Sequence, residues 1–384
     1  MAEVARAPDA ATNTAISTDK AVTTAKAALS YGIDWNVGRH ELVSGMLGLG
    51  ASGIVMPIPG STRCVKAVMP WHTGFLRDLQ CRHLRREIEV YRHLHTVGVV
   101  GAADPSTNTR HPRFCQMFAA SDDGRDNVSL TLEYLPNWTV DEYLRGYSHH
   151  QSLGSKKGTF TRRRHDTIPM RQRARWALEA ADGLAQLHAH GVIHADLKPL
   201  NMALDAGLGL RIIDLAGCAL LAQNKPPLCL ESTRFFLPRS MKAADNYSVT
   251  TDLFALGSSL YQIVTGYQPY DDLSDDEVEA RYSRHEFPDL APPAPTVALF
   301  EDDTTRVDDV GGVGIGGVRA STGRLLFADI MQACWLCEVP SAAAVLEALL
   351  REVRSEFSDD DLRFIQEASG IPLDVEGQSE TVTH

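Results

Sequence analysis

The stretch HADLKPLN, residues 194–201, combines an acid, a base and an amide at fixed offsets. Asp196 supplies a carboxylate, Lys198 follows it by two positions, and Asn201 follows it by five. A further carboxylate, Asp214, comes eighteen residues after Asp196. Each of these residues alone is an ordinary turn or capping residue. Their combined order and spacing make chance a poor explanation and predict a catalytic loop.

The apolar run LRII, residues 210–213, predicts a strand that delivers Asp214 at its end. Carboxylate and amide oxygens are hard ligands that Mg²⁺ accepts beside water and substrate phosphates. Asn201 and Asp214 are therefore the predicted metal ligands. Asp196 is then free to accept the proton of an attacking hydroxyl, or to orient that hydroxyl.

A glycine-rich stretch, GLGASGIV at residues 48–55, matches the pattern G-x-G-x-x-G-x-V. Alone, it does not separate a dinucleotide-binding fingerprint from a chance glycine turn. A dinucleotide-binding fold requires a helix directly after the glycines, whereas the run IVMPI with its proline indicates a second strand. A glycine hairpin lets backbone N–H groups approach phosphates, because no side chains hold the ligand away. The nucleotide-binding positions predicted in it are Gly48, Gly50, Gly53 and Val55.

Lys66 lies in the apolar stretch CVKAV, which has the pattern of a strand. Lysine is rarely buried without a partner, so this position requires an anion. Glu87, in the helical stretch RREIEV, is one candidate, and phosphate oxygens are another. The alternative is that Lys66 protects an exposed strand edge against pairing with other chains.

The composition excludes several functional classes. The net charge of −12 argues against nucleic acid as a partner, since phosphate backbones select basic surfaces. No apolar run approaches the ~18 residues that a membrane span needs. The seven cysteines are scattered and odd in number, which favours a reducing intracellular compartment, cytoplasmic or nuclear. Cys334 and Cys337 form one C-x-x-C, for which core packing is favoured over a redox or metal role.

The chain of 384 residues suits one large domain or two lobes that share a cleft. Strand-like segments give way to helical ones near Tyr134, where a small lobe is expected to meet a larger one. Residues 356–384 are predicted to be a C-terminal tail, with a docked helix and a free end as open alternatives. The remaining divisions are a disordered tail at 1–36, a strand-rich lobe at 37–133, and a helical lobe at 134–355 with insertions near 145–168 and 301–323.

These features together resemble the eukaryotic protein kinase family over roughly residues 40–352. The resemblance implies a bilobal α+β fold with a strand-rich lobe and a helical lobe. Lys66 and Glu87 match the strand lysine and its helix partner, and residues 194–201 match the catalytic loop. Asp214 stands where the metal-binding DFG motif begins. Asp252 and Gly257 match the central helix of the large lobe, where the aspartate braces the catalytic loop.

The family mechanism implies roles for these residues in transfer of the γ-phosphoryl group of ATP. Lys66 would hold the α- and β-phosphates, with Glu87 fixing its orientation. Asp196 would accept the substrate hydroxyl, and Lys198 is the choice typical of serine/threonine kinases. Asn201 and Asp214 would hold Mg²⁺. The residues expected around adenine are the gatekeeper Leu132, the backbone of Glu133 and Leu135, Cys64 in the roof and Ala203 in the floor.

Several positions depart from the family pattern. Ala195 replaces the arginine that often binds a phosphorylated activation loop, which makes the catalytic loop non-RD and predicts weak dependence on such phosphorylation. Leu215 and Ala216 replace the Phe and Gly of DFG. Arg239 and Val339 stand where the family has an ion-paired Glu and Arg. Because both partners of that pair are lost together, no buried charge is left unpaired.

Every position with a chemical role is filled. The sequence therefore predicts an ATP- and Mg²⁺-dependent serine/threonine protein kinase that acts on a protein substrate. The alternative is a pseudokinase or weakly active kinase that serves as an ATP-binding scaffold, which the altered DFG segment favours. A third possibility is a small-molecule kinase of related fold. The DLKPLN loop and the long segment between Asp214 and Arg239 argue against it, since both resemble peptide-substrate architecture.

Overall fold

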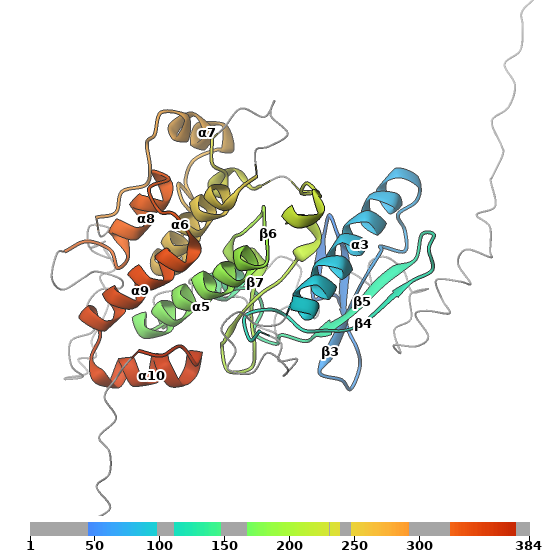
Figure 1. Cartoon of the computed structure of the whole chain (residues 1–384), viewed down its shortest axis with the longest axis horizontal. Coiled ribbons are helices and arrows are strands. Elements are labelled where there is room, and N and C mark those ends of the chain that lie inside the picture. The colour runs from blue at the N-terminus through green and yellow to red at the C-terminus, as the bar shows by residue number, and fades with distance from the viewer. Residues whose placement is uncertain are drawn as a thin grey trace, which may run out of the picture.

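The computed structural model describes residues 45–97, 111–146, 167–229, 231–238, 247–291 and 323–373. The predicted N-terminal tail, Arg239 and nearly all of the two predicted insertions lie outside these ranges. Within them, a small sheet with one long helix lies beside a larger helical part (Figure 1). The predicted bilobal α+β fold is confirmed.

The small lobe contains a five-stranded antiparallel sheet with the order β1-β2-β3-β5-β4. Gly53 begins β2 with a φ of 145°, and a Cβ there would lie 2.4 Å from the carbonyl oxygen of Ala67. Only glycine fits that turn. Lys66 pairs with Val55 on one side and Leu130 on the other, so it lies on a central strand. The strands are β1 (Gly48–Gly50), β2 (Gly53–Pro57), β3 (Arg63–Ala67), β4 (Met117–Asp122) and β5 (Val128–Glu133).

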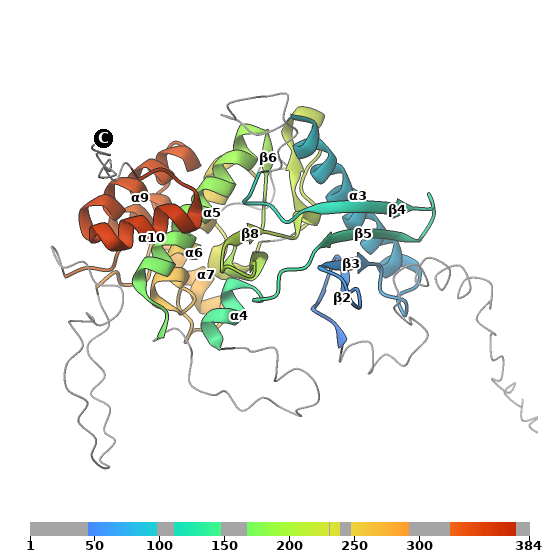
Figure 2. The ribbon, with the colours of Figure 1, turned by 90° about the horizontal axis from the view of Figure 1, so that it is seen from below.

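Helix α3 (Gly74–Val97) packs on one face of this sheet, beside β4 and β5 (Figures 1 and 2). Leu84, Ile88 and Tyr91 recur at helical spacing and are all buried. Glu87 lies on the same helix and is also fully buried. The apolar face therefore fixes the rotation of the helix and, with it, the direction in which Glu87 points.

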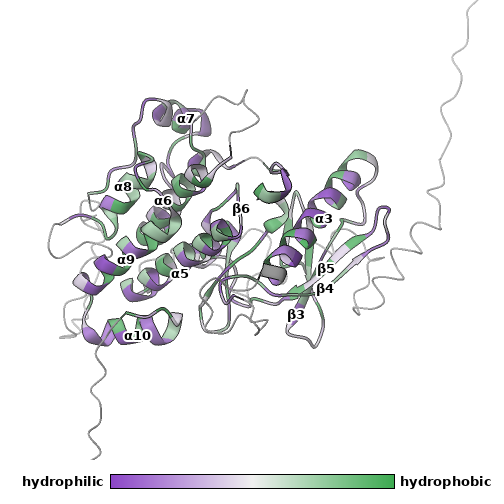
Figure 3. Ribbon diagram, in the orientation of Figure 1, coloured by the Kyte–Doolittle hydropathy of each residue, from purple (hydrophilic) through white to green (hydrophobic). Residues whose placement is uncertain are grey.

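The larger lobe surrounds helix α6, which is buried along nearly its whole length and is rich in apolar residues (Figure 3). A Cβ on Gly257 would lie 2.7 Å from the Cβ of Cys334 on α8, so glycine is required for the two helices to approach this closely. Gly266 ends α6 with a left-handed φ of 82°. The helices of this lobe are α4 (Val140–Arg145), α5 (Met170–Ala189), α6 (Val249–Thr265), α7 (Asp275–Ser283), α8 (Ala328–Trp335), α9 (Ala342–Glu356) and α10 (Asp359–Ser369).

The end of the described chain is a docked helix. α10 packs against α5, with Leu362 and Ile365 buried in the same core as the rest of the lobe (Figure 1). Residues 359–369 therefore belong to the helical lobe, which decides between the two alternatives left open for this part of the chain. The final residues, 374–384, lie outside the described ranges.

All seven cysteines are free. Cys334 is fully buried against α6, as core packing requires, whereas Cys337 is exposed at the end of its helix. Within the described ranges, no group of three or more His, Cys, Asp or Glu side chains is placed to hold a metal ion. The C-x-x-C therefore contributes one core residue and one surface residue.

Two short strand pairs place the catalytic segments. β7 (Met202–Leu204) pairs with β8 (Leu210–Ile212), and β6 (Val192–Ile193) pairs with β9 (Ala219–Leu220). β7 begins directly after Asn201, and β8 ends two residues before Asp214. The antiparallel pairing of the two strands therefore brings Asn201 and Asp214 together. The Ile213 N–H donates to the Asn201 carbonyl oxygen over 3.0 Å, which closes this junction.

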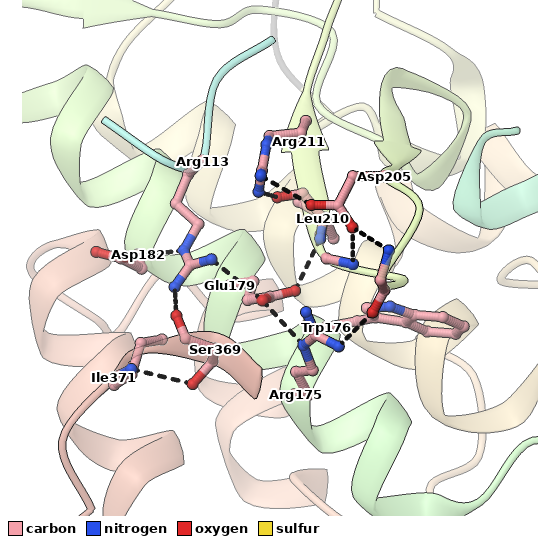
Figure 4. A network of polar contacts seen from close by, with 12 residues as sticks. Arg113, Arg175, Trp176, Glu179, Asp182, Asp205, Leu210, Arg211, Ser369 and Ile371 are labelled. Atoms are coloured by element: carbon pink, nitrogen blue, oxygen red, sulfur yellow. Dashed lines mark hydrogen bonds and ion pairs between the residues drawn. The ribbon is translucent and has the colours of Figure 1, made fainter. Parts of the chain in front are cut away.

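A buried ionic network joins the two lobes to the C-terminal helix (Figure 4). Glu179 on α5 is fully buried and accepts from Arg113 Nη1 and Arg175 Nε, each over 3.1 Å, and from the Leu210 N–H over 2.8 Å. Arg113 also donates to Asp182 over 2.9 Å and to the Ser369 carbonyl oxygen. The Glu179 carboxylate thus links three parts of the protein, which are the segment that leads into β4, helix α5 and strand β8.

Replacing Glu179 with alanine leaves two arginine charges buried without their shared carboxylate. Removal of one partner from a buried ion pair costs about 3–5 kcal/mol, and we expect a loss of unfolding free energy in that range. Urea denaturation measures it. Arg171→Ala on the same helix is the control, because the Arg171–Asp361 pair is exposed and such pairs contribute about 1 kcal/mol or less. Equal losses in the two variants would contradict the role given to Glu179.

His111 lies beside this network and contacts the Phe114 ring at a centroid distance of 5.4 Å. Burial lowers the pKa of His111 from its usual 6.5 to about 4, with nearby Arg113 adding to the shift and the carboxylate of Asp182 opposing it. The folded protein therefore rejects a proton that the unfolded chain accepts below pH 6.5.

We expect this difference to destabilise the fold as the pH falls from 6.5 towards 4, because protons then bind more to the unfolded chain. In His111→Gln, which cannot titrate, this contribution disappears and the melting temperature should fall less steeply over the same interval. Parallel thermal melts of the two proteins measure the difference. Identical slopes would show that His111 titrates alike in both states.

Candidate active site

Lys66 is the centre of the site. It is buried on β3, and its Nζ lies 2.7 Å from Glu87 Oε2 and 2.6 Å from Asp214 Oδ1. The three residues come from the sheet, from α3 and from the end of β8. Because β3 lies inside the sheet, Lys66 does not protect a strand edge. Its charge is instead balanced by two carboxylates from distant parts of the sequence.

The two carboxylates differ in their surroundings. Burial raises the pKa of Glu87, and the Lys66 charge only partly opposes this shift. For Asp214 burial also acts upward, but the Lys66 charge and the hydrogen bonds from Lys66 and Ser52 outweigh it, so its pKa lies below the usual value. Burial likewise opposes the charge on Lys66, yet Asp214 and Glu87 raise its pKa above the usual lysine value. Negative charge is therefore most stable on Asp214, where a cation would be held.

The catalytic loop is tied together by its own side chains. Lys198 Nζ lies 2.9 and 2.8 Å from the two carboxylate oxygens of Asp196, and donates to Ser232 Oγ over 2.6 Å. Asn201 Nδ2 donates to the Asp196 carbonyl oxygen over 2.8 Å and to its carboxylate over 3.1 Å. The acid, the base and the amide of the HADLKPLN stretch thus form one hydrogen-bonded group.

The donor set suits Mg²⁺. The amide nitrogen of Asn201 is used on Asp196, so its amide oxygen is the atom left for a ligand. Among the described residues, neither that oxygen nor Asp214 Oδ2 accepts a hydrogen bond from the protein. Hard, negatively polarised oxygens that lack protein partners are what a magnesium ion requires.

Asp252 on helix α6 is fully buried and supports the catalytic loop. Its carboxylate accepts the backbone N–H groups of His194 over 2.8 Å and Ala195 over 2.9 Å, and contacts His188 Nε2 at 2.9 Å. Ala195 has a φ of 64° and Asp214 a φ of 57°, which non-glycine residues rarely adopt. The expected bracing of the loop by Asp252 is present, and it holds a strained backbone in place.

The glycine-rich turn lies beside Asp214. Ser52, between Gly50 and Gly53, donates from Oγ to Asp214 Oδ1 over 3.1 Å. Ser52 was not among the predicted nucleotide-binding positions, although its place inside the glycine pattern was a usable signal. Gly48 and Val55 face each other across the β1–β2 pair, so the turn is carried by a regular hairpin.

The positions expected around adenine lie at the junction of the lobes. Cys64 and Leu132 are paired across β3 and β5, and both are buried, as is Ala203 on β7. The Cys64 thiol donates to the Glu133 carbonyl oxygen over 3.4 Å, and burial raises the pKa of Cys64 to about 12. Leu135 packs against the main core as a partly buried side chain.

The departures from the family pattern have structural explanations. Leu215 is fully buried in the main core, so it fills an apolar position. A Cβ on Gly217 would lie 2.3 Å from Cys229 Sγ, which explains why a glycine follows Ala216. Ala195 packs with Ile193 and Ala219. That apolar cluster occupies the position from which an arginine would extend.

Two residues that contact the site were not predicted from the sequence, and one position of the family pattern lies outside the described residues. Ser232 contacts Lys198, and His188 contacts Asp252. Neither has a local sequence signal, because each depends on an approach between distant segments. Val339 packs against the helical lobe, whereas its family partner position, Arg239, lies outside the described residues.

The chain is similar to known protein kinases. The family model for the protein kinase domain matches residues 43–308. A probable serine/threonine-protein kinase of Dictyostelium discoideum is 27% identical over 43% of this chain and 16% of its own length. The Aurora kinase of Eremothecium gossypii is 22% identical over 50% of this chain and 43% of its own. Aurora kinase A-A of Xenopus laevis is 26% identical over 53% of this chain and 42% of its own.

The chain thus matches less than half the length of each of these relatives. In the described residues, no helix is both long and apolar enough to cross a membrane. The family match covers more than half of the chain, and the two lobes and the lysine–carboxylate geometry agree with it. This chain belongs to the protein kinase family.

Proposed function

We propose that the chain is an active serine/threonine protein kinase, which transfers the γ-phosphoryl group of ATP to a hydroxyl of a protein substrate with the help of Mg²⁺. The observation that carries the proposal is the position of Lys66, within 2.7 Å of Glu87 and 2.6 Å of Asp214. A lysine oriented by one carboxylate and adjacent to a second is placed to bind phosphates beside a metal ion.

ATP would lie between the lobes, under the glycine hairpin. Lys66 would bind the α- and β-phosphates and Glu87 would keep it oriented. The backbone of Gly50 to Gly53 would contact the phosphates, because its glycines allow close approach. Adenine would lie against Cys64 and Ala203, with its edge towards the segment that begins at Glu133.

Asn201 and Asp214 would hold Mg²⁺, which supplies neutralisation of the charge on the phosphates when it is bound. Asp196 would orient the substrate hydroxyl and accept its proton. Lys198 contacts both Asp196 and Ser232, so it would keep the carboxylate in place while adding positive charge beside the transferred group.

Serine/threonine specificity is supported by Lys198 and by the Dictyostelium discoideum relative that carries that name. The scaffold alternative is not favoured, because all the chemical positions are filled and in contact. Seven free cysteines support a reducing compartment, and we propose an intracellular location, cytoplasmic or nuclear.

Asp196→Asn tests the catalytic role directly. The substitution keeps the shape of the side chain but removes the proton acceptor, so we expect kcat to fall by about 10²–10⁴-fold. Phosphoryl transfer from labelled ATP to a generic basic protein or to the kinase itself measures it. Asp276→Asn, an exposed substitution on α7, is the matched control and should retain full activity. Equal activity of Asp196→Asn and the parent would refute the assignment.

The metal site has a readout that does not require turnover. ATP with Mg²⁺ should raise the melting temperature more than ATP with EDTA, because a ligand that binds only the folded state stabilises it by about 2.7 kcal/mol at a hundredfold excess over Kd. In Asp214→Asn we expect the Mg²⁺-dependent part of that increase to vanish. A shift of the same size in the variant, or no effect of Mg²⁺ in the parent, would argue against the proposed ligands.

A further inference from the structure

The first part of the segment that follows Asp214 carries no side chain that a kinase could phosphorylate. Residues 215–231 contain no serine, threonine or tyrosine. On the other side, Ala195 stands in the catalytic loop and is buried in an apolar cluster, so it offers no charge to a phosphate. Even so, residues 215–229 form defined turns and a strand, β9, against β6. Another interaction must hold this segment.

Arg86 on α3 makes that interaction. Its Nη1 donates to the carbonyl oxygens of Cys218 and Pro226, each over 2.7 Å. The Arg86 side chain is only 10% exposed, and its bond to Cys218 is partly buried. Hydrogen bonds from a charged donor are shorter and stronger than those between neutral groups. One guanidinium nitrogen therefore joins two points of the segment that are eight residues apart.

Two further contacts from α3 reach the same segment. His83 is buried, and its Nε2 lies 3.1 Å from the carbonyl oxygen of Leu228, which identifies this nitrogen as the donor. Glu89 pairs with Lys225. His83, Arg86 and Glu89 are spaced by three residues, so they lie along one face of the helix. This face is distinct from the position of Glu87, which points to Lys66.

The same segment also contacts the catalytic loop. The Leu228 N–H donates to the Gly217 carbonyl oxygen over 3.0 Å, which closes residues 217–228 into a compact loop. At its far end, the Cys229 thiol donates to the Ala195 carbonyl oxygen over 3.4 Å, directly before Asp196. A continuous set of contacts thus runs from α3 through the segment to the catalytic aspartate.

We propose that Arg86 is a positioning residue that fixes the segment after Asp214 to α3, in the place that a phosphate-dependent contact would otherwise take. Arg86 and Glu87 are adjacent on α3. One placement of this helix therefore allows both the Glu87–Lys66 ion pair and the bonds from Arg86 to the segment. Helix α3 cannot move away from Lys66 without breaking both charged hydrogen bonds of Arg86. Residues 215–231 are therefore positioned without a phosphate of their own. This inference rests on the proposed function.

The variants that test it are Arg86→Gln, which cannot bridge both carbonyl groups with a charge, and Arg86→Lys, which retains the charge. Arg82→Gln is the control, since Arg82 is exposed on the same helix. Misplacement of a catalytic assembly by about 1 Å can cost about 10²-fold, and we expect kcat/KM of Arg86→Gln to fall by roughly 10–100-fold. Arg86→Lys should regain part of the activity, and Arg82→Gln should match the parent.

Hydrogen exchange gives a readout that does not depend on activity. In Arg86→Gln, exchange should quicken in residues 218–228 and in the adjacent part of α3, while α5 and α6 stay protected. Unchanged exchange in residues 218–228, or an equal increase in α5 and α6, would overturn the positioning role. If the parent showed no kinase activity, the proposed function would fail, whereas exchange would still decide the role of Arg86.

Phosphatase treatment of the parent tests independence from phosphate. We expect the treated and untreated proteins to phosphorylate substrate at rates within about twofold, because Arg86 holds residues 218–226 to α3 whether or not the neighbouring hydroxyls of Ser232 and Thr233 carry phosphate. A loss of about tenfold or more after treatment would show that a phosphate orders the site and would overturn the inference.

Discussion

The ammonium group of Lys66 is the constraint on which the active arrangement depends. A buried charge is costly unless it is paired and hydrogen-bonded, and Lys66 is buried inside the sheet. Its two partners come from α3 and from the end of β8 in the other lobe. The need to satisfy one lysine therefore fixes the position of a helix and the distance between the lobes. Ser52, which also bonds Asp214, brings the glycine turn under the same constraint.

The helical lobe uses buried carboxylates in a related way. Asp252 accepts two consecutive backbone N–H groups of the catalytic loop, and Glu179 accepts one from β8 between two arginines. In both cases a carboxylate on a helix accepts backbone N–H groups of a neighbouring segment. The support from Asp252 allows Ala195 to keep a left-handed backbone conformation directly before Asp196.

The contacts of Arg86 extend this arrangement to the segment after Asp214. If α3 holds this segment, no phosphate is needed there. This explains both the alanine at position 195 and the absence of hydroxyl residues from 215 to 231. Arg86 and Glu87 are neighbours in sequence but point to different partners, because successive side chains on a helix are about 100° apart. One helix thus couples the phosphate-binding lysine to the segment beside the catalytic loop.

The sequence by itself determined the bilobal fold, the glycine hairpin, the catalytic loop and the choice of Lys66, since these rest on local patterns with fixed spacing. Contacts between distant segments could not be read in this way. Nothing local distinguishes Arg86 from Arg82 or Arg85, because the rotation of α3 decides which arginine meets the segment. The docking of α10 was likewise left open, since it depends on the packing of Leu362 and Ile365 into the core and on a bond from Arg113, far along the chain, to the Ser369 carbonyl oxygen. Only the packed tertiary structure, in which buried charges must find partners, decided these contacts.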